Sequence, residues 1–339
     1  DLMLFDKLIV FDAYKQKLIL IAGVRTDALE ASYEKARREI QEMVSLLKSG
    51  ARAVFKPLRL ETKLTPAHNE AEFSRMVEHA KHHIFEGDIF QVVLSNPLTA
   101  KATGSLFDVY RTLRVLNPSP YMFYFVSDDV EIAGASPETL AKLEDGTLYT
   151  FPLAGTRPRG KTESEDRQLE KELLSDEKEI AEHNMLVDLG RNDLGRVSEI
   201  GSVKVTRYMD ILRYSHVMHI GSTVEGRLAK GKDAIDAIDS VLPAGTLSGA
   251  PKLSACTIIQ QEESRKRGIY GGAIGYLDFS GNMDTCIGIR LAYKKNGILC
   301  IQSGAGLVAD SVPAREYQEC INKAKAMVTA IEAAEGGLE

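Results

Sequence analysis

The sequence predicts an α+β fold in which helices cover large antiparallel sheets. Two observations support this class. Short apolar runs occur in pairs around turn residues, as at 139–143 and 147–151, which flank Glu-Asp-Gly at 144–146. Long stretches with helix-forming composition separate these pairs. Hairpins that are interrupted by helices favour antiparallel sheets over the parallel sheet of an alternating βαβ chain.

The first half of the chain is expected to combine hairpins, helices and one buried strand. The run at 89–95 is apolar almost throughout, which is typical of a strand buried on both faces. The helix before Pro118 ends there, because proline disfavours a helical residue on its N-terminal side. In order, we expect two strands around the turn at 14–17 within 4–22, helices at 27–48 and 69–85, a strand at 89–95, a helix at 103–116, and strands at 121–126 and 130–133.

The second half is expected to hold a long helix, a three-stranded meander and a last helix. Pro313 suits the first turn of that last helix, with Ser311 or Asp310 as its N-cap. Asn296-Gly297 is a typical hairpin turn within the meander. After the hairpin at 139–151, we expect helices at about 166–189 and from 252 to before Gly268, strands at 273–279, 285–293 and 298–302, and a helix from Pro313.

Composition excludes several classes of protein. The 339 residues are 44% hydrophobic and 27% charged, a normal globular balance that leaves room for one large or two smaller domains. No apolar run reaches the ~18 residues that a membrane helix needs, so we expect no membrane association. The formal net charge of −6 argues against a nucleic-acid partner, whose binding requires a basic surface. An anionic ligand would need a local cationic pocket or a metal ion.

Cysteine usage indicates a reducing compartment. Cys256, Cys286, Cys300 and Cys320 lie in apolar stretches, and none belongs to a C-x-x-C pair. Buried free thiols of this kind are typical of the cytoplasm. The sequence begins at Asp1 and leads directly into a strand-like run with no signal peptide, so we expect a fragment or a chain that has lost its start.

Two predicted helices each present a pair of carboxylates. Glu179 and Glu182 are three residues apart, and so are Glu316 and Glu319, which places each pair on one helix face. Together they could hold a hard divalent cation such as Mg²⁺, which prefers one or two carboxylates with water and ligand oxygens. The alternative is two solvated acidic faces with ordinary charge pairing, as between Glu319 and Lys323.

Two glycine-rich segments could bind an anion through backbone N–H groups. Ser303-Gly304-Ala305-Gly306 follows a predicted strand, and its glycines allow a close approach; the alternative is a plain tight turn. The segment 242–252, Leu-Pro-Ala-Gly-Thr-Leu-Ser-Gly-Ala-Pro-Lys, precedes a helix. The N-terminus of a helix attracts anions, although an ordinary capped helix start explains the same residues.

Histidine and arginine give further candidates. His216 and His219 lie in a strand-like stretch at odd separation, so only one of them can face a site. Arg290 stands among apolar residues, and a buried arginine needs a carboxylate partner, either internal or from a ligand. The charged segment with His79, His82 and His83 is read as a solvated helix face, with a metal site as the alternative.

Taken in order, nine segments resemble the chorismate-utilising enzymes, and among these the large subunits (component I) of anthranilate synthases. The resemblance covers roughly residues 60–330. It implies antiparallel sheets packed as a sandwich with helices outside, a chorismate-binding catalytic domain at 60–335, and at 1–60 the remnant of an N-terminal region packed on the core. The segments are Pro118–Tyr124, Gly134–Glu138, Pro152–Gly160, Lys178–Asp193, Ser215–His219, Leu242–Lys252, Tyr270–Gly272, Gly304–Gly306 and Glu316–Lys323.

The resemblance also implies a role for each candidate residue. Glu182 and Glu319 would bind Mg²⁺, and Glu179 and Glu316 would bind it through water. Glu138 would be the acid that helps the ring hydroxyl leave, and His219 would serve pyruvate elimination. The implied substrate contacts are Gly304, Ala305 and Gly306 with the ring carboxylate, Tyr270 and Arg290 with the enolpyruvyl carboxylate, and Gly155, Thr156, Thr246 and Lys323 around the ring.

The implied reaction is the Mg²⁺-dependent conversion of chorismate and ammonia to anthranilate and pyruvate, the first committed step of tryptophan biosynthesis. Relatives that form 4-amino-4-deoxychorismate carry a nucleophilic lysine at the position of Ala154; that activity is the alternative within the family. None of the four cysteines has the Gly-x-Cys-x-Gly setting of a glutaminase. Glutamine would therefore require a separate amidotransferase subunit (component II), and the chain alone would use free ammonia.

Tryptophan is the feedback inhibitor that the resemblance implies. Pro120, Tyr121 and Met122 match one half of that inhibitor site, whereas the Leu-Leu-Glu-Ser motif of the other half does not occur in these 339 residues. A tryptophan-binding regulatory module without catalysis is the alternative from outside the enzymes.

Overall fold

The structure, a computed structural model, describes residues 2–214, 217–263 and 265–338. The chain divides into two compact units, Asp1–Phe55 and Lys56–Glu339. The first unit contains the antiparallel hairpin β1 (Lys7–Asp12) and β2 (Lys17–Ala22), a 3₁₀ turn at Thr26–Ala28 and helix α1 (Leu29–Ser49). The hairpin and the helix agree with the sequence expectation.

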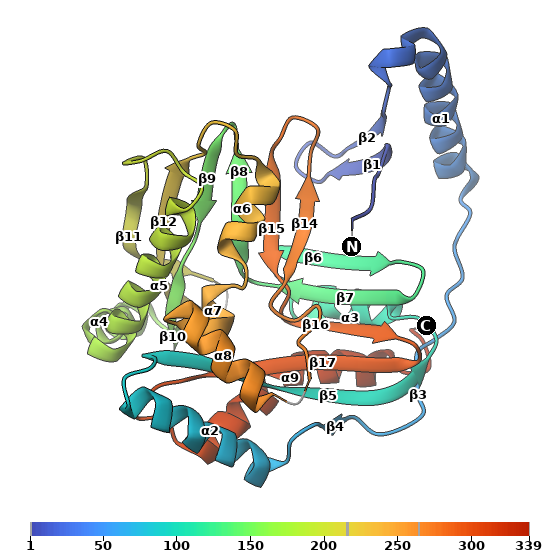
Figure 1. Cartoon of the computed structure of the whole chain (residues 1–339). Helices are drawn as coiled ribbons and strands as arrows, with labels where there is room; N and C mark the ends of the chain where they lie inside the picture. Colours follow the sequence, from blue (N-terminus) through green and yellow to red (C-terminus); the bar gives the residue numbers. More distant parts are fainter. Residues whose placement is uncertain (1, 215–216, 264, 339) are drawn as a thin grey trace. The chain divides into compact units, whose positions relative to one another are not determined.

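The second unit is built on two antiparallel sheets whose strands run in different directions (Figure 1). The eight-stranded sheet has the order β13-β5-β17-β16-β7-β6, and β3 and β4 also pair with β5. Its strands are β3 (Arg59–Leu60), β4 (Thr65–Pro66), β5 (Gln91–Thr103), β6 (Tyr121–Val126), β7 (Val130–Ser136), β13 (Gly249–Ala250), β16 (Leu291–Lys295) and β17 (Ile298–Leu307).

The seven-stranded sheet has the order β10-β12-β9-β8-β15-β14, with β11 paired to β12. Its hairpin β8–β9 is the one expected around residues 144–146. The strands are β8 (Thr139–Glu144), β9 (Thr147–Thr150), β10 (Leu153–Pro158), β11 (Lys204–Arg213), β12 (Val217–Arg227), β14 (Ala273–Leu277) and β15 (Met283–Ile287). The predicted α+β class with large antiparallel sheets is therefore confirmed.

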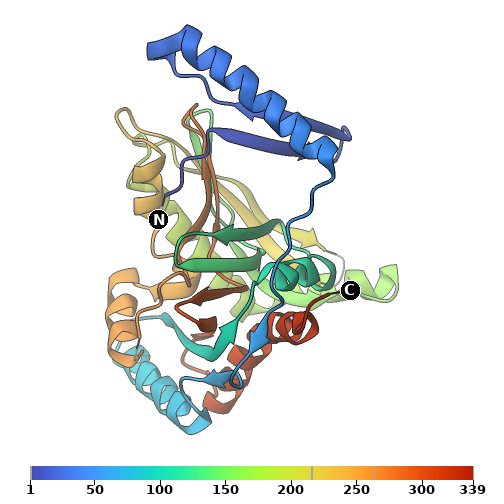
Figure 2. The ribbon, with the colours of Figure 1, turned by 90° about the vertical axis from the view of Figure 1, so that its right-hand side faces the viewer.

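Helices pack on the sheets, as Figures 1 and 2 show around α2 and α9. They bury their apolar faces there. Apolar residues of β5 and β17 contact α3 and α9 at one end of the eight-stranded sheet, and α2, α8 and α9 at the other. The helices are α2 (Glu70–Phe85), α3 (Phe107–Leu116), α4 (Glu163–Ser175), α5 (Glu177–Gly195), α6 (Ala234–Val241), α7 (Gly245–Ser248), α8 (Lys252–Glu262) and α9 (Pro313–Ala334).

The expected strand at 285–293 was wrong as one element. The chain leaves β15 at Ile287, crosses to the other sheet and begins β16 at Leu291. Arg290 has a φ of 53°, a left-handed conformation that ends a strand. The meander is therefore two hairpins, β14–β15 and β16–β17, in two sheets, and Arg290 lies at the crossing.

The expected helix at 166–189 was also wrong as one element, because Asp176 separates α4 from α5. Its backbone is extended, and its side chain accepts hydrogen bonds from the N–H groups of Lys178 and Glu179. Aspartate is a strong N-cap, so it begins a new helix inside a stretch of otherwise helical composition. This break sets the start of α5 and the position of its glutamates.

Three smaller expectations need adjustment. The buried strand expected at 89–95 continues to Thr103, and the helix expected from 103 begins only at Phe107. Pro313 does occupy the first turn of α9, but its N-cap is Val312, without a side-chain hydrogen bond. Ser311 instead accepts a hydrogen bond from the Val308 N–H in the preceding loop.

Candidate active site

The candidate site is built around β17 and residues of α9 that contact it. Gly304 and Gly306 alternate along this strand with Ala305, whose side chain belongs to the apolar core on the opposite face. The Gly-Ala-Gly segment is therefore strand, and not the turn that the sequence suggested. A Cβ atom at Gly304 would stand 2.7 Å from the Leu94 carbonyl oxygen and 2.9 Å from the Tyr270 hydroxyl. Glycine at this position keeps the backbone accessible.

Lys323 connects α9 with β17. Its ammonium lies 2.6 Å from Glu319 Oε1 and donates to the carbonyl oxygen of Gly304 over 3.1 Å. Arg290 donates through Nη1 to the backbone carbonyl of Lys323. The two cations, the Glu319 carboxylate and the glycine strand therefore lie next to one another, as expected for residues that share an anionic ligand.

Tyr270, which is buried, and Arg290, which is half-buried, both lie near residues that contact the glycine strand. Tyr270 is only 5% exposed, and burial raises the pKa of its hydroxyl, so the group stays neutral and can donate a hydrogen bond. Burial lowers the pKa of Arg290, while Tyr270 and Glu319 act in the opposite direction. No carboxylate in the described part of the chain forms an ion pair with Arg290. A ligand carboxylate would supply that partner.

The four glutamates of α5 and α9 act on each other electrostatically. Burial raises the pKa of Glu182, and the neighbouring charges of Glu179 and Glu319 raise it further. Burial likewise raises the pKa of Glu316, with a further increase from Glu319. Lys178 and Lys323 oppose these shifts at both glutamates. Glu319 of α9 thus lies near enough to Glu182 of α5 for their charges to interact.

These carboxylates fit a cation in charge and in ligand type. Among the described residues, no group of three or more His, Cys, Asp or Glu side chains stands close enough together to hold a metal ion. Glu182 nevertheless forms no hydrogen bond or ion pair with a described residue, and its like-charged neighbours disfavour its ionised form. A hard divalent cation would remove that repulsion, and oxygen ligands of this type are the ones Mg²⁺ takes.

His219 lies on β12 and faces β10. Its Nδ1 atom is 2.9 Å from the carbonyl oxygen of Gly155 and 3.1 Å from Thr156 Oγ1. Gly155 has a φ of +67°, and a Cβ there would stand 3.2 Å from Glu179 Oε2. The site therefore continues from the glutamates of α5 to His219. His216, the other histidine of this stretch, lies outside the described residues.

Glu138 and Thr246 complete the site at a cavity of about 50 Å³ between β8, α5 and α7. Burial raises the pKa of the Glu138 carboxyl to about 7, although the nearby Thr246 hydroxyl and the Lys323 ammonium partly lower it. Thr246 Oγ1 is buried without a hydrogen-bond partner among the described residues. A carboxyl with this pKa can carry a proton at neutral pH and release it to a substrate.

Sequence reasoning missed Gln91. It begins β5 and is 7% exposed, and its Oε1 atom has no hydrogen-bond partner among the described residues. Its Nε2 atom would stand 2.9 Å from a Cβ at Gly306, so the amide lies against the glycine strand. A single glutamine before an apolar run gives no indication of this place, because the contact depends on how β5 and β17 pair.

The predicted inhibitor residues lie at the start of edge strand β6. The Tyr121 hydroxyl donates to Asp284 Oδ1 over 2.8 Å and stands 2.8 Å from Thr139 Oγ1, which links the two sheets. Met122 packs on the core near α3 and α9, and Pro120 is exposed. No contact places these three among the catalytic candidates described above.

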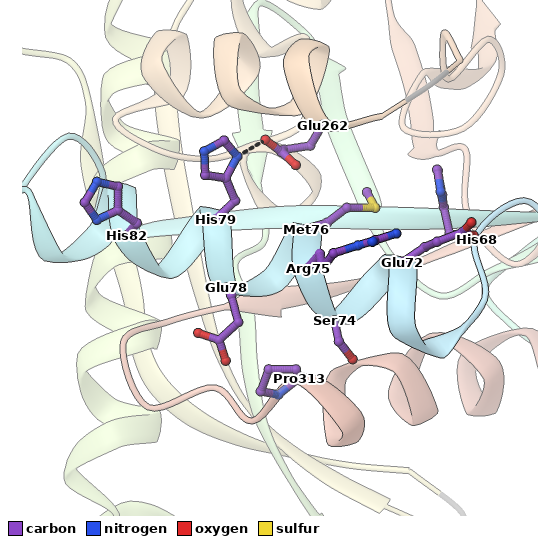
Figure 3. Close-up of a pocket in the computed structure, with 10 residues that line it drawn as sticks. All are labelled: His68, Glu72, Ser74, Arg75, Met76, Glu78, His79, His82, Glu262 and Pro313. Atoms are coloured by element: carbon purple, nitrogen blue, oxygen red, sulfur yellow. Dashed lines mark hydrogen bonds and ion pairs between the residues drawn. The ribbon is translucent and has the colours of Figure 1, made fainter.

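A larger hollow lies elsewhere, along α2, and measures about 840 Å³ (Figure 3). Its wall includes His79, whose Nδ1 is 2.6 Å from Glu262 Oε1, and His82, but none of the predicted site residues. The side chain of His79 is 61% exposed, as on a solvated helix face. The described helices also lack the length and apolar character needed to cross a membrane.

Comparison with known proteins assigns the fold and the family. The sequence profile described as chorismate binding enzyme matches residues 1–329. Anthranilate synthase component 1 of Acetivibrio thermocellus is 50% identical over 340 residues, which cover 98% of this chain and 69% of that protein. The protein of that name from Aquifex aeolicus (strain VF5) is 46% identical over 342 residues, with 100% and 69% covered. The crystal structure of anthranilate synthase component I from Streptococcus pneumoniae TIGR4 matches with a TM-score of 0.85 at 44% identity, over 95% of this chain and 72% of that one. This chain belongs to the chorismate binding enzyme family.

Proposed function

We propose that this chain converts chorismate and ammonia to anthranilate and pyruvate. The proposal is carried by the contacts of Lys323 with Glu319 and the Gly304 carbonyl, and by the hydrogen bond from Arg290 to the Lys323 carbonyl. The relatives named anthranilate synthase component 1 support the same reaction. The catalytic domain is proposed to span 60–335, with 1–60 as the remnant of an N-terminal region, in a protein of the cytoplasm.

We propose that the site binds the two carboxylates of chorismate with different groups of residues. Arg290 and Tyr270 would bind the enolpyruvyl carboxylate, because both are donors without a carboxylate partner among the described residues. The backbone N–H groups of residues 304–306 would approach the ring carboxylate, and Gly155, Thr156, Thr246 and Lys323 would surround the ring. Separate contacts for the two carboxylates fix the orientation of the ring.

Mg²⁺ is proposed as the cofactor. Glu182 and Glu319 would bind it directly, and Glu179 and Glu316 would hold its water ligands. Bound there, the ion neutralises the ring carboxylate and orients it, a contribution of the electrostatic kind. The chain's own part is to place Glu182 and Glu319 near enough for their charges to interact.

Two proton transfers are proposed. Glu138 would give its proton to the ring hydroxyl, which leaves as water while ammonia forms the new C–N bond. His219 would then take the ring proton while the enolpyruvyl C–O bond breaks, and the departing enol becomes pyruvate. Elimination leaves an aromatic ring bearing the amine.

Ammonia is proposed to come from glutamine through a separate amidotransferase subunit. Cys286, Cys300 and Cys320 are buried, and burial raises the pKa of each thiol, for Cys320 to about 12. A glutaminase nucleophile needs an accessible thiol of low pKa, which these three do not offer. The chain alone should therefore use free ammonia.

The test is the fluorescence of anthranilate formed from chorismate and ammonium, with Mg²⁺ or with EDTA. Product that requires the metal is expected, and no product with Mg²⁺ present would reject the proposal. Mass spectrometry of the product separates anthranilate from 4-amino-4-deoxychorismate. Ala154 in β10 is buried and offers no amine for the second reaction.

Tryptophan is proposed as an inhibitor that contacts Pro120, Tyr121 and Met122. Calorimetry with tryptophan tests this. Binding of tryptophan by a chain that does not turn over chorismate would favour a regulatory module over an enzyme.

A further inference from the structure

We propose that Arg267 is a positioning residue that holds three walls of the active site in one arrangement. The walls are β5 beside the glycine strand, the α7 segment that carries Thr246, and the Tyr270 ring. The inference rests on the proposed function, because it assigns to Arg267 an effect on chorismate binding through Tyr270 and the glycine strand. Neither a charge pattern nor the family resemblance singled this arginine out.

Arg267 is anchored by a buried carboxylate. Its Nε donates to Glu263 Oε2 over 2.9 Å, and its Nη2 donates to Glu263 Oε1 over 2.5 Å. Glu263 is in turn fixed to β5, because its Oε1 accepts hydrogen bonds from Ser95 N at 2.9 Å and from Ser95 Oγ at 2.8 Å. The side chains of Arg267 and Glu263 are 17% and 5% exposed, so solvent screens this pair little. These contacts fix the orientation of the Arg267 guanidinium in the absence of a ligand.

The remaining N–H groups reach two walls of the site. Nη2 donates to the Val93 carbonyl over 2.6 Å, and Nη1 donates to the Leu247 carbonyl over 2.5 Å. Val93 pairs with Gly306 of the glycine strand. Leu247 follows Thr246, the neighbour of Glu138. One guanidinium thus connects the proposed carboxylate cradle with the segment that lines the acid.

The third wall is Tyr270. The guanidinium carbon lies 5.6 Å from the centre of the Tyr270 ring, within the range of a cation–π contact. The Tyr270 N–H also donates to the Arg267 carbonyl over 3.1 Å. The Tyr270 hydroxyl would stand 2.9 Å from a Cβ at Gly304, so the ring that Arg267 supports ends at the glycine strand. Movement of the guanidinium would shift this hydroxyl.

Only arginine can make this set of contacts. Four N–H···O contacts leave the planar group in two directions, and its face lies on an aromatic ring. A lysine ammonium has three donors at a single point and cannot bridge the same carbonyls. Arg267→Lys keeps the charge, and it should therefore separate the loss of geometry from the loss of charge.

The test compares two buried glutamates, Glu263 at the end of α8 and Glu131 in β7. Glu263→Gln weakens the anchor of Arg267, and Glu131→Gln weakens the matched pair of Glu131 with Lys294, whose Nζ–Oε2 distance is 2.8 Å. Glu131 also accepts from a serine hydroxyl and a backbone N–H, as Glu263 does, but it contacts no proposed site residue. Both variants should lower the melting temperature. Only Glu263→Gln and Arg267→Lys should raise the KM for chorismate, by about tenfold, and lower kcat.

KM is the decisive readout, because a purely structural loss reduces the amount of active enzyme and leaves KM unchanged. The double variant Arg267→Lys, Tyr270→Phe should raise KM by less than the product of the single effects, since both act through one ring. An unchanged KM in Glu263→Gln, or an equal rise in Glu131→Gln, would overturn the inference. If Arg267→Lys does not fold, the KM values of Glu263→Gln and Glu131→Gln still test the inference.

Calorimetry separates this inference from the proposed function. If the wild-type chain forms no anthranilate but binds chorismate, the reaction assignment fails, and the positioning role is then read from the affinity for chorismate. A tenfold weaker affinity in Glu263→Gln, with no change in Glu131→Gln, would still support it; equal affinities would reject it.

Discussion

The Nδ1 atom of His219 stands 2.9 Å from the carbonyl oxygen of Gly155. A carbonyl oxygen can only accept a hydrogen bond, so this contact places the proton of a neutral imidazole on Nδ1. The lone pair is then on Nε2, the atom that must act if His219 takes a proton from the substrate. The backbone of β10 thereby selects the tautomer that the proposed base role of His219 requires.

We predict that His219→Gln separates the two halves of the reaction. Loss of a positioned base should lower the rate of anthranilate formation by about 10²–10⁴. The aminated ring that still carries the enolpyruvyl group should accumulate, because the steps before elimination do not need His219. Mass spectrometry of the reaction mixture would detect it. The exposed His82 supplies the control, since His82→Gln should leave the rate unchanged; rapid anthranilate formation by His219→Gln would exclude the base role.

Gly155→Ala should impair both folding and activity. The φ of +67° strains an alanine by about 1–2 kcal/mol, and the new Cβ would meet the Leu173 side chain at 2.8 Å and Glu179 Oε2 at 3.2 Å. Gly146→Ala is the matched control, because its φ is +78° and nothing lies within 4 Å of a Cβ there. Thermal unfolding should show a loss in both variants, and activity should fall only in Gly155→Ala. Equal activities would show that the Glu179 contact does not matter.

The pKa of Glu138, raised by burial to about 7, sets a limit on the pH range of the reaction. A general acid works while it is protonated, so kcat should fall as the pH rises through about 7. The measurement is kcat against pH at a fixed concentration of free ammonia, so that the supply of nucleophile stays constant. Glu138→Gln cannot donate this proton, so its rate should be about 10²–10⁴ lower. The fall of kcat near pH 7 should also be absent from this variant. If the kcat of the variant still falls near pH 7, another group is responsible for that fall.

Glu319→Gln should raise the concentration of Mg²⁺ needed for half-maximal activity while the fold remains intact. The amide removes one of the negative charges that raise the pKa of Glu182, and with it a ligand of the proposed ion. Activity titrated with Mg²⁺ after treatment with EDTA measures this, and circular dichroism checks the fold. Glu163→Gln, on the exposed face of α4, is the control. Identical Mg²⁺ titrations for the two variants would remove Glu319 from the metal site.

Local patterns predicted the parts of the site that depend on neighbouring residues in the chain. The spacing of Glu179 and Glu182 places both on α5 whatever the tertiary structure, and Pro313 marks the first turn of α9. The hairpin at 139–151 follows from its turn residues. The interaction of Glu182 with Glu319 did not follow from spacing, which fits two solvated faces equally well; the ordered resemblance favoured it.

The remaining features depend on tertiary contacts. Asp176 is an N-cap rather than a helix interior residue because its carboxylate reaches the next turn and also pairs with Arg157 at 2.8 Å. Arg290 reads as part of one strand, yet its positive φ lets the chain change sheets. Gln91 lies beside the glycine strand only because β5 pairs with β17. No window of sequence contains these partners.

Arg290→Ala should weaken the binding of chorismate more than it slows the chemistry. Arg290 is half-buried, donates to the Lys323 carbonyl, and has no carboxylate partner in the described part of the chain, so a substrate carboxylate would be its counterion. Removing one member of a buried, hydrogen-bonded charge pair costs about 2–5 kcal/mol, and each 1.4 kcal/mol is a factor of ten in affinity. KM should therefore rise at least tenfold. Arg290→Lys should recover part of the loss, because it keeps the charge without the bidentate fork. A change in KM of less than tenfold in Arg290→Ala would show that Arg290 does not contact the substrate and instead serves the junction of the two sheets.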